Sequence, residues 1–190
     1  MNTVEPIRDP EAVRRIEEQL AQLDDDRGRR MYLLFEVGIY LGLRISDNVR
    51  LKVGDVLGKE VLTLREQKTG KLTQLPIADK LQRVFRDRLK GMEADAYLFP
   101  SRQRDQDGQP RPIGRKTAYN DIQRMAAIAR LDYPVGCHSL RKTFGYHYYK
   151  QSGDIAFLMI WFNHSTIEVT KRYLGIDLDE RAKKIRRFEI

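Results

Sequence analysis

The segment HSLRKTF holds two residue types that suit phosphate chemistry. His138 and Arg141 are three positions apart, so on a helix they project from the same face. A guanidinium offers paired planar donors to phosphate oxygens, and an imidazole can transfer a proton near neutral pH. Such pairs are also common on protein surfaces, so the spacing predicts a phosphate site only together with other signals.

The segment NHSTIEVTKRYL carries a histidine before an expected helix and a tyrosine near the end of that helix. Ser165 and Glu168 predict a capping box at the helix start. Its free N–H groups and positive dipole end favour an anion close to His164. Tyr173 has two interpretations, a nucleophile or a half-buried aromatic residue that anchors the helix.

Two basic residues farther upstream stand where a phosphate could be bound. Arg44 in GLRISDNVRL directly follows an apolar segment, so its charge must be solvated, paired or placed in a cleft. Asp47 is the expected partner that orients Arg44, and a local salt bridge is the simpler interpretation. Lys68 in KTGK lies at or near the tip of an expected β-hairpin, where a lysine, like Lys71, is ordinarily a solvated turn residue.

The sequence contains no Cys and His cluster with metal-ligand spacing, no phosphate-binding loop and no dinucleotide fingerprint. We therefore expect no metal ion and no other cofactor. His147 lies six residues past Arg141 and off its helical face, so we assign it a structural role. The remaining candidates share one chemistry: two arginines, a lysine, two histidines and a tyrosine suit metal-free phosphoryl transfer.

The elements that must position these residues are mainly helical. Asp9 as N-cap and Pro10 at the first helical position predict a helix over residues 9–23. A more apolar helix is expected to follow and to run through Leu43. Ser46 is expected to cap a short helix after it.

In the next segment, the spacing of the hydrophobic residues changes from that of a helix to the alternation that is typical of β-strands. VLTLREQKTGKLTQLPI predicts a hairpin with Gly70 in its turn. Asp79 is expected to cap the next helix and Gly91 to end it. Residues 100–116 are polar and rich in turn residues, which predicts a mobile surface loop whose arginines could also touch a nucleic acid.

The rest of the chain is expected to be helical. Helices are predicted over residues 117–130, 139–151 and 155–162, the last with Asp154 as its N-cap, and an amphipathic helix over residues 177–190. We find no repeat and no boundary that would split the chain. The predicted fold class is therefore mainly α with one small antiparallel β-sheet (α+β), in a single domain.

Composition narrows the class of protein. Of 190 residues, 41% are hydrophobic and 33% are charged, which excludes disordered and fibrous chains. No apolar run approaches the roughly 20 residues that span a bilayer, and the polar N-terminus lacks a secretory signal. The single cysteine, Cys137, fits a reducing cytosol. A net charge of +8 favours polyanionic partners.

The ordered set of motifs resembles the catalytic domain of the tyrosine recombinase, or phage integrase, family over nearly the whole chain. GLRISDNVRL is similar to the family's first arginine box, and REQKTGK to its hairpin lysine, which favours Lys68 over Lys71. HSLRKTF matches the His-x-x-Arg box, and NHSTIEVTKRYL matches the final box with its nucleophilic tyrosine. The order of the set is more specific than any single box.

Two features depart from the family's pattern. Phe162-Asn163 stands where the family usually has Leu-Gly before the second histidine. Asparagine tolerates the left-handed conformation, so we expect the turn to survive with different packing beneath it. Many members also carry an N-terminal DNA-clasping domain, whereas we expect residues 1–190 to be one catalytic domain, free-standing or cut from a longer chain, without a separate core-binding domain.

The resemblance implies a mechanism of DNA strand exchange through a covalent 3′-phosphotyrosyl intermediate. In it Tyr173 attacks the scissile phosphate and His138 takes the phenolic proton. The clamp on the phosphate oxygens is assigned to Arg44 and Arg141. The resemblance also implies three supporting roles. Lys68 protonates the leaving 5′-oxygen, and His164 donates a hydrogen bond to a phosphate oxygen. Asp47 holds Arg44 in place.

The resemblance also implies the partners and the setting. We expect double-stranded DNA as partner, self-association to a dimer or tetramer on DNA, no membrane, and the cytoplasm of a bacterial, phage or mobile-element host. The C-terminal helix would make the subunit contact through Ile185 and Phe188, with packing on its own core as the alternative. Two other functions stay open: a type IB topoisomerase, which relaxes supercoils as a monomer, and a non-catalytic DNA-binding accessory protein.

Overall fold

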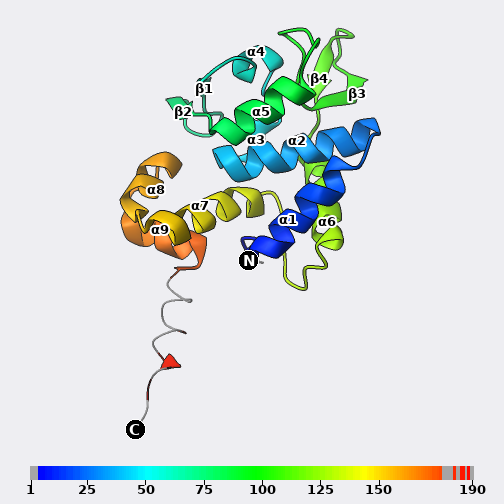
Figure 1. Cartoon of the computed structure of the whole chain (residues 1–190). Coiled ribbons are helices and arrows are strands. Elements are labelled where there is room, and N and C mark those ends of the chain that lie inside the picture. The colour runs from blue at the N-terminus through cyan, green and yellow to red at the C-terminus, as the bar shows by residue number, and fades with distance from the viewer. Residues whose placement is uncertain (1–3, 177–181, 183–184, 187, 189–190) are drawn as a thin grey trace.

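The computed structural model describes residues 4–176, 182, 185, 186 and 188. Its elements follow one another along the chain as α1 (Pro10–Ala21), α2 (Asp26–Leu41), α3 (Ile45–Asn48), α4 (Val53–Val56), β1 (Val61–Arg65), β2 (Leu72–Pro76), α5 (Asp79–Arg88), β3 (Pro100–Arg104), β4 (Pro110–Pro112), α6 (Arg115–Ile128), α7 (Ser139–Ser152), α8 (Ile155–Phe162) and α9 (Ile167–Leu174). The predicted class, mainly helical with small antiparallel strands, is confirmed (Figure 1).

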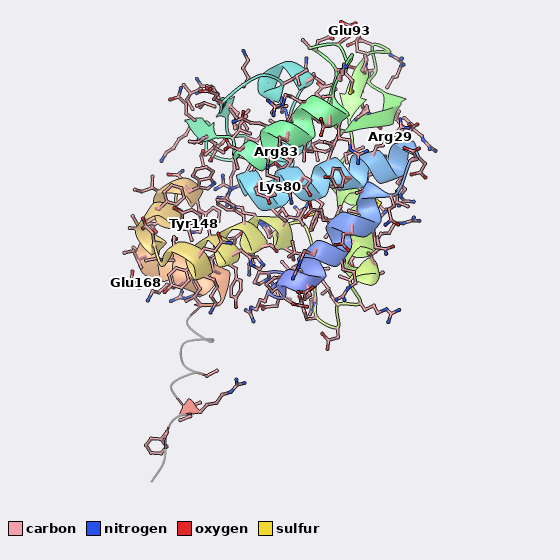
Figure 2. The ribbon with its side chains drawn as sticks, in the orientation of Figure 1. Arg29, Lys80, Arg83, Glu93, Tyr148 and Glu168 are labelled. Carbon is pink, nitrogen blue, oxygen red and sulfur yellow. The ribbon has the colours of Figure 1, made fainter. Side chains whose placement is uncertain are left out.

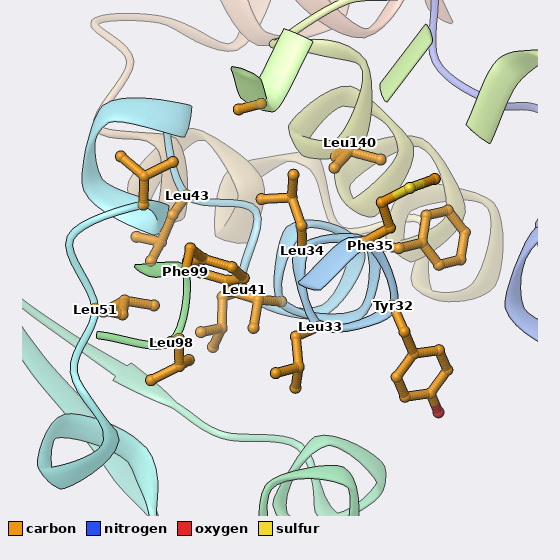
Figure 3. Close-up of a cluster of buried hydrophobic side chains, with 14 of the residues drawn as sticks. Tyr32, Leu33, Leu34, Phe35, Leu41, Leu43, Leu51, Leu98, Phe99 and Leu140 are labelled. Carbon is orange, nitrogen blue, oxygen red and sulfur yellow. The ribbon is translucent and has the colours of Figure 1, made fainter. Parts of the chain in front are cut away.

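Helix α2 is the centre of the packing. It contacts α1, α5, α6 and α7, and most of its residues are buried. Figure 3 shows Leu34 and Phe35 of α2 beside Leu140 of α7. Gly38 permits the close approach of the two helices, because a Cβ atom at this position would lie only 2.6 Å from the Leu140 side chain. This contact brings the C-terminal end of α2 next to the start of α7.

A second, smaller core joins α7, α8 and α9. Its buried residues are Leu158, Phe162, Leu174 and Ile176. Gly145 of α7 permits the approach, because an added Cβ atom would lie 2.7 Å from both Phe162 and Leu174 side-chain atoms. Figure 2 shows the Tyr148 side chain within this helical unit. The unit holds the C-terminal motif against the rest of the fold.

The predicted hairpin is confirmed. Strands β1 and β2 pair antiparallel, from Val61 opposite Pro76 to Arg65 opposite Leu72, and Lys68 lies in the turn between them. The side chains at Leu62 and Leu75 are buried, which attaches the hairpin to the main core.

The expected loop over residues 100–116 is wrong. This segment forms a second antiparallel hairpin, β3–β4, and α6 begins at Arg115. The Asp105 carboxylate accepts hydrogen bonds from the backbone N–H groups of Asp107 and Gln109 and so closes the turn. Buried residues at both ends, Phe99 and Ile113, are joined by a backbone hydrogen bond of 2.8 Å. The strands are mostly exposed, so no apolar alternation marked them in the sequence.

Two predicted helix caps are confirmed. The Asp9 carboxylate accepts a hydrogen bond from the Glu11 N–H at 3.0 Å, and the Asp154 carboxylate accepts one from the Phe157 N–H at 2.9 Å. In both cases the cap satisfies an N–H group that has no partner inside its helix.

Two other predicted caps are wrong. Ser46 lies inside α3, whose N-cap is Arg44 in an extended conformation. Asp79 is the first residue of α5, whose N-cap is Ala78 with no side-chain hydrogen bond. Helix α5 also ends at Arg88 rather than at Gly91. Neither helix therefore begins with a side-chain cap.

None of the helices that the structure describes is long and apolar enough to cross a membrane. Most of the amphipathic segment expected at 177–190 lies outside the described residues. Within it, Ile185 and Phe188 are described and are 67% and 66% exposed.

Candidate active site

Arg141 is the buried centre of the site. Its side chain leaves the first turn of α7, and the residue is 4% exposed. Its guanidinium donates to the Gly42 carbonyl at 2.6 Å and to the Phe162 carbonyl at 3.0 Å. These bonds join the end of α2 to the end of α8. Burial lowers the pKa of Arg141, but a guanidinium remains charged at neutral pH.

Arg44 is paired with Glu66 and not, as expected, with Asp47. Its guanidinium donates to the Glu66 carboxylate at 2.6 Å, and Thr69 donates to the same oxygen at 2.8 Å. Burial raises the pKa of Glu66, but the hydrogen bonds from Thr69 and Arg44 outweigh burial and lower it overall. Glu66 therefore stays ionised and holds the arginine.

Asp47 instead supports the hairpin. Its carboxylate accepts a hydrogen bond from the backbone N–H of Gln67 at 2.9 Å, directly before Lys68. Glu66 was missed because it is 22 residues from Arg44 in the chain and precedes a turn, where an acidic residue is ordinarily solvated. Its place two residues before Lys68 in REQKTGK was the available signal.

Lys68 is exposed in the β1–β2 turn, and its side chain has no hydrogen-bond or ion-pair partner among the described residues. It lines a hollow of about 460 Å³ together with Arg44, Arg115 and His138. The folded chain therefore brings this lysine, an arginine and a histidine from three distant segments to one surface depression.

His138 is the N-cap residue of α7. Its ring lies 6.5 Å from the ring of Tyr173 and nearly perpendicular to it. Although the residue keeps contact with solvent, burial lowers its pKa, and the positive charges of Arg141 and Arg115 lower it further. The imidazole is therefore neutral at pH 7 and able to accept a proton.

His164 follows a left-handed turn. Asn163 caps α8 with φ 54° and ψ 47°, as expected for a residue in the place of a glycine. Burial, followed by the charges of Arg141 and Arg44, lowers the pKa of His164 to about 4. Its Nδ1 lies 3.0 Å from the Thr170 hydroxyl. The Thr170 hydroxyl also lies 3.2 Å from the Thr166 carbonyl, to which it can donate, and Nδ1 then carries the ring proton. In the other tautomer the hydroxyl donates to Nδ1, and Nε2 carries a proton that can be donated to a phosphate oxygen.

The predicted capping box at Ser165 is wrong. The N-cap of α9 is Thr166, whose hydroxyl accepts a hydrogen bond from the Val169 N–H at 3.2 Å. The one-residue shift leaves His164 and Ser165 in the turn between α8 and α9, where His164 is free to face the site.

Tyr173 lies on α9 with its hydroxyl buried, and this hydroxyl makes no well-aligned hydrogen bond with the part of the chain that is described. The centre of its ring is 5.2 Å from that of His164 and 5.7 Å from that of Phe162. Burial raises the pKa of Tyr173, and the nearby charges of Arg141 and Arg44, together with a hydrogen-bonding contact from Arg141, oppose this. Arg141 is close, but its well-aligned donors bond the Gly42 and Phe162 carbonyls.

Lys142 is a site residue that sequence reasoning missed. Its ammonium lies 5.1 Å from the centre of the Tyr173 ring and donates to the Val4 carbonyl at 2.8 Å. Burial lowers its pKa. The residue follows Arg141 in the sequence and so points to another side of α7, and only the tertiary contact with α9 shows that it lies over Tyr173.

The structure thus gathers Arg44, His138, Arg141, His164 and Tyr173, with Lys68 at the rim and Asp47 beneath the hairpin. His147 contacts the Ile7 carbonyl at 2.8 Å instead. Among the described residues, no group of three or more His, Cys, Asp or Glu side chains could hold a metal ion.

The phage integrase family model matches residues 9–179, which is most of the chain. The chain belongs to the phage integrase family. It is 39% identical over 180 residues to the probable integrase/recombinase YoeC of Bacillus subtilis, covering 94% of this chain and 93% of that protein. It spans only about half the length of several other curated relatives, between 47% and 53%.

Solved structures of a recombinase and an integrase share the fold. The XerA recombinase superimposes with a TM-score of 0.69 at 23% identity, over 98% of this chain and 68% of that one. A lambda integrase dimer bound to a COC′ core site superimposes with a TM-score of 0.66 at 18% identity, over 92% of this chain and 48% of that one. The predicted family and fold are therefore confirmed.

Proposed function

We propose that this chain is a site-specific recombinase that cuts and rejoins double-stranded DNA through Tyr173. The observation that carries the proposal is the buried Tyr173 hydroxyl, which has no well-aligned partner among the described residues and lies beside Arg141, with the rings of His138 and His164 close to its own. A buried polar group without a partner is costly, which is typical of functional sites. All of this chemistry is assigned to one catalytic domain, residues 1–190.

In the proposed reaction the Tyr173 oxygen forms a bond to the scissile phosphorus, and the bond from phosphorus to the 5′-oxygen breaks. The products are a 3′-phosphotyrosyl link and a free 5′-hydroxyl. The link retains the energy of the phosphodiester, so a second 5′-hydroxyl can reverse the step without ATP. Exchange of strands between two sites follows when that hydroxyl comes from another duplex.

The two arginines stabilise the transition state. Negative charge grows on the non-bridging oxygens, and Arg44 and Arg141 are the fixed cations that face it. Removal of one such preorganised donor typically costs about 3–4 kcal/mol of barrier. Glu66 supports this role because its ionised carboxylate keeps the Arg44 guanidinium in one orientation.

Protons are moved by His138 and Lys68. A phenol with an ordinary pKa of about 10 is rarely ionised at pH 7, and burial raises the pKa of Tyr173 further, so a base is required. The neutral imidazole of His138 takes the phenolic proton. Lys68, at the rim of the hollow, gives a proton to the departing 5′-oxygen. His164 donates a hydrogen bond to a non-bridging oxygen, and Asp47 holds the hairpin that carries Lys68.

The partners in this proposal are double-stranded DNA and further copies of the chain. The net charge of +8 supports binding to a phosphate backbone. The exposed side chains of Ile185 and Phe188 support a subunit contact through the C-terminal segment, since both are about two-thirds exposed, at 67% and 66%. The setting is the cytoplasm of a bacterial, phage or mobile-element host.

The test is covalent trapping on labelled, nicked duplexes taken from the protein's own genetic neighbourhood. Wild-type protein should give an adduct that survives denaturation, and Tyr173→Phe should give none. Tyr148→Phe is the matched control, because it removes a hydroxyl from α7 and keeps the ring that stacks on Phe157. An adduct with Tyr173→Phe, or none with wild type on any duplex, would contradict the proposal. Relaxation of supercoils without strand exchange would favour the topoisomerase alternative.

A further inference from the structure

A hydrogen bond between two exposed residues connects the β1–β2 hairpin to the turn before α9. The Lys71 ammonium donates to the side-chain oxygen of Asn163 at 2.9 Å, across 92 residues of sequence. Figure 1 shows the hairpin above α8, on whose C-terminal end Asn163 lies. Neither residue is assigned a part in the chemistry above.

The Asn163 side chain is held in a defined direction by its backbone. The residue adopts φ 54° and ψ 47°, its N–H donates to the Ile160 carbonyl at 2.9 Å, and the His164 N–H donates to the Met159 carbonyl at 2.9 Å. Glycine can adopt the same backbone conformation without strain. It lacks the amide, so the bond to Lys71 depends on asparagine at this position.

The hairpin turn is also held from its other side. Asp47 of α3 accepts from the Gln67 N–H at 2.9 Å, and Glu66 joins Arg44 at 2.6 Å. Lys68 therefore lies between two anchors, one before it on α3 and one after it on the α8–α9 turn. Backbone hydrogen bonds from the Glu66 N–H to the Lys71 carbonyl at 2.9 Å and from the Gly70 N–H to the Glu66 carbonyl at 2.8 Å close the turn, so Lys68 and Lys71 move together. Without the bond to Asn163, the tip of the hairpin could swing as a unit and carry Lys68 away from the hollow.

We propose that the contact between Lys71 and Asn163 is a latch that positions Lys68 for protonation of the leaving 5′-oxygen. The inference rests on the proposed function. Lys71 and Asn163 are positioning residues in it, since they act through Lys68 and do not touch the reacting atoms. The latch ties the hairpin to the residue adjoining His164, which binds the same phosphate, so the acid and the phosphate-binding side chain move together.

The test compares two otherwise identical duplexes, one with the natural 5′-oxygen at the scissile bond and one with sulfur in its place. A thiolate leaves without protonation, because its conjugate acid is far stronger than an alcohol, so cleavage of the sulfur duplex needs no general acid. Single-turnover cleavage would be measured for Asn163→Gly, Lys71→Met and their combination. Lys68→Met is the reference for a lost acid, and Lys59→Met is a control on another exposed lysine.

Each latch variant should cleave the oxygen duplex about three- to tenfold more slowly, the range expected for one exposed charge-assisted hydrogen bond. The sulfur duplex should be cleaved at the wild-type rate. The double variant should equal the single ones, and Lys59→Met should match wild type on both duplexes.

Unchanged cleavage of the oxygen duplex by both latch variants would overturn the latch. Equal losses on the two duplexes would also overturn it, because they indicate damage to the scaffold. A wild-type protein that cleaves neither duplex would overturn the proposed function itself, which separates that failure from a failure of the latch.

Discussion

The Arg44 guanidinium is held by Glu66 through a hydrogen bond of 2.6 Å, so the hairpin that carries Lys68 also orients an arginine of the proposed phosphate clamp. A single buried carboxylate thus connects the two parts of the site that come from the first half of the chain. Movement of the hairpin and placement of the first arginine are coupled through it.

Substitution Glu66→Gln should lower the single-turnover rate of DNA cleavage about tenfold or more, because a neutral amide holds a guanidinium less strongly than a carboxylate does. Asp47→Asn is the matched comparison, since its remaining oxygen can still accept from the Gln67 N–H. The loss should be smaller for Asp47→Asn. Equal losses would contradict the assignment of Glu66 as the partner of Arg44.

Substitution Lys142→Met should slow cleavage about three- to tenfold, since the cation above the Tyr173 ring contributes roughly 0.5–2 kcal/mol in such contacts. Lys142→Arg keeps a cation near the ring and should retain more activity. The measurement is the rate of adduct formation, with the melting temperature recorded for each variant. A Met variant of full activity would show that Lys142 only supports the Val4 segment.

The histidines predict an acid limb in the stability profile. The folded-state pKa of His164 is about 4, below the unfolded value near 6.5, so the unfolded chain binds more protons in that interval. The contribution of His164 to the free energy of unfolding should therefore fall as pH drops from about 6.5 to about 4. In the His164→Gln variant, the free energy of unfolding measured with urea should change less with pH over this range than it does in wild type. If the free energy of unfolding of the variant changes with pH as steeply as that of wild type, His164 does not contribute to this pH dependence.

Glu36 predicts a contribution of the opposite sign over nearly the same pH range, so each contribution is measured as a difference between a variant and wild type. It is 0% exposed on α2, its carboxylate oxygens have no partner in the part of the chain that is described, and burial raises its pKa to about 7. Glu17 raises this pKa further, while Lys80, which lies over α2, lowers it (Figure 2). The folded state holds this proton more tightly than the unfolded chain, so stability should decline as pH rises from about 4.5 to 7.

The variant Glu36→Gln should remove that decline. It should be more stable than wild type by about 2–3 kcal/mol at pH 8, and close to wild type at pH 4.5, where both side chains are neutral. Urea unfolding at the two pH values measures this difference. Equal stabilities at pH 8 would mean that Glu36 is not buried as an uncompensated charge.

Deletion of residues 179–190 should separate cleavage from assembly. Without the exposed Ile185 and Phe188, the truncated chain should sediment as a smaller complex on DNA and lose recombination between two sites. Adduct formation on a single nicked duplex measures whether Tyr173 remains competent. Unchanged recombination by the truncated protein would contradict a subunit contact through this segment.

Local chemistry was sufficient to predict much of this molecule. The hairpin around Lys68, the caps at Asp9 and Asp154, and the left-handed turn at Asn163 each depend on a few neighbouring residues. The boxes around Arg44, His138, Arg141, His164 and Tyr173 could be recognised because their residue types and order are specific. Local spacing also determined that His138 and Arg141 lie together at the start of α7.

Tertiary structure alone decided how these parts support one another. The partner of Arg44 is Glu66, 22 residues away, and not the nearby Asp47, because the hairpin folds over α3. Lys142 meets Tyr173 only after α9 packs on α7, and Lys71 meets Asn163 only after the hairpin reaches α8. The β3–β4 strands are polar and are held by buried residues at their ends. These contacts join distant segments, so no local pattern of residues could specify them.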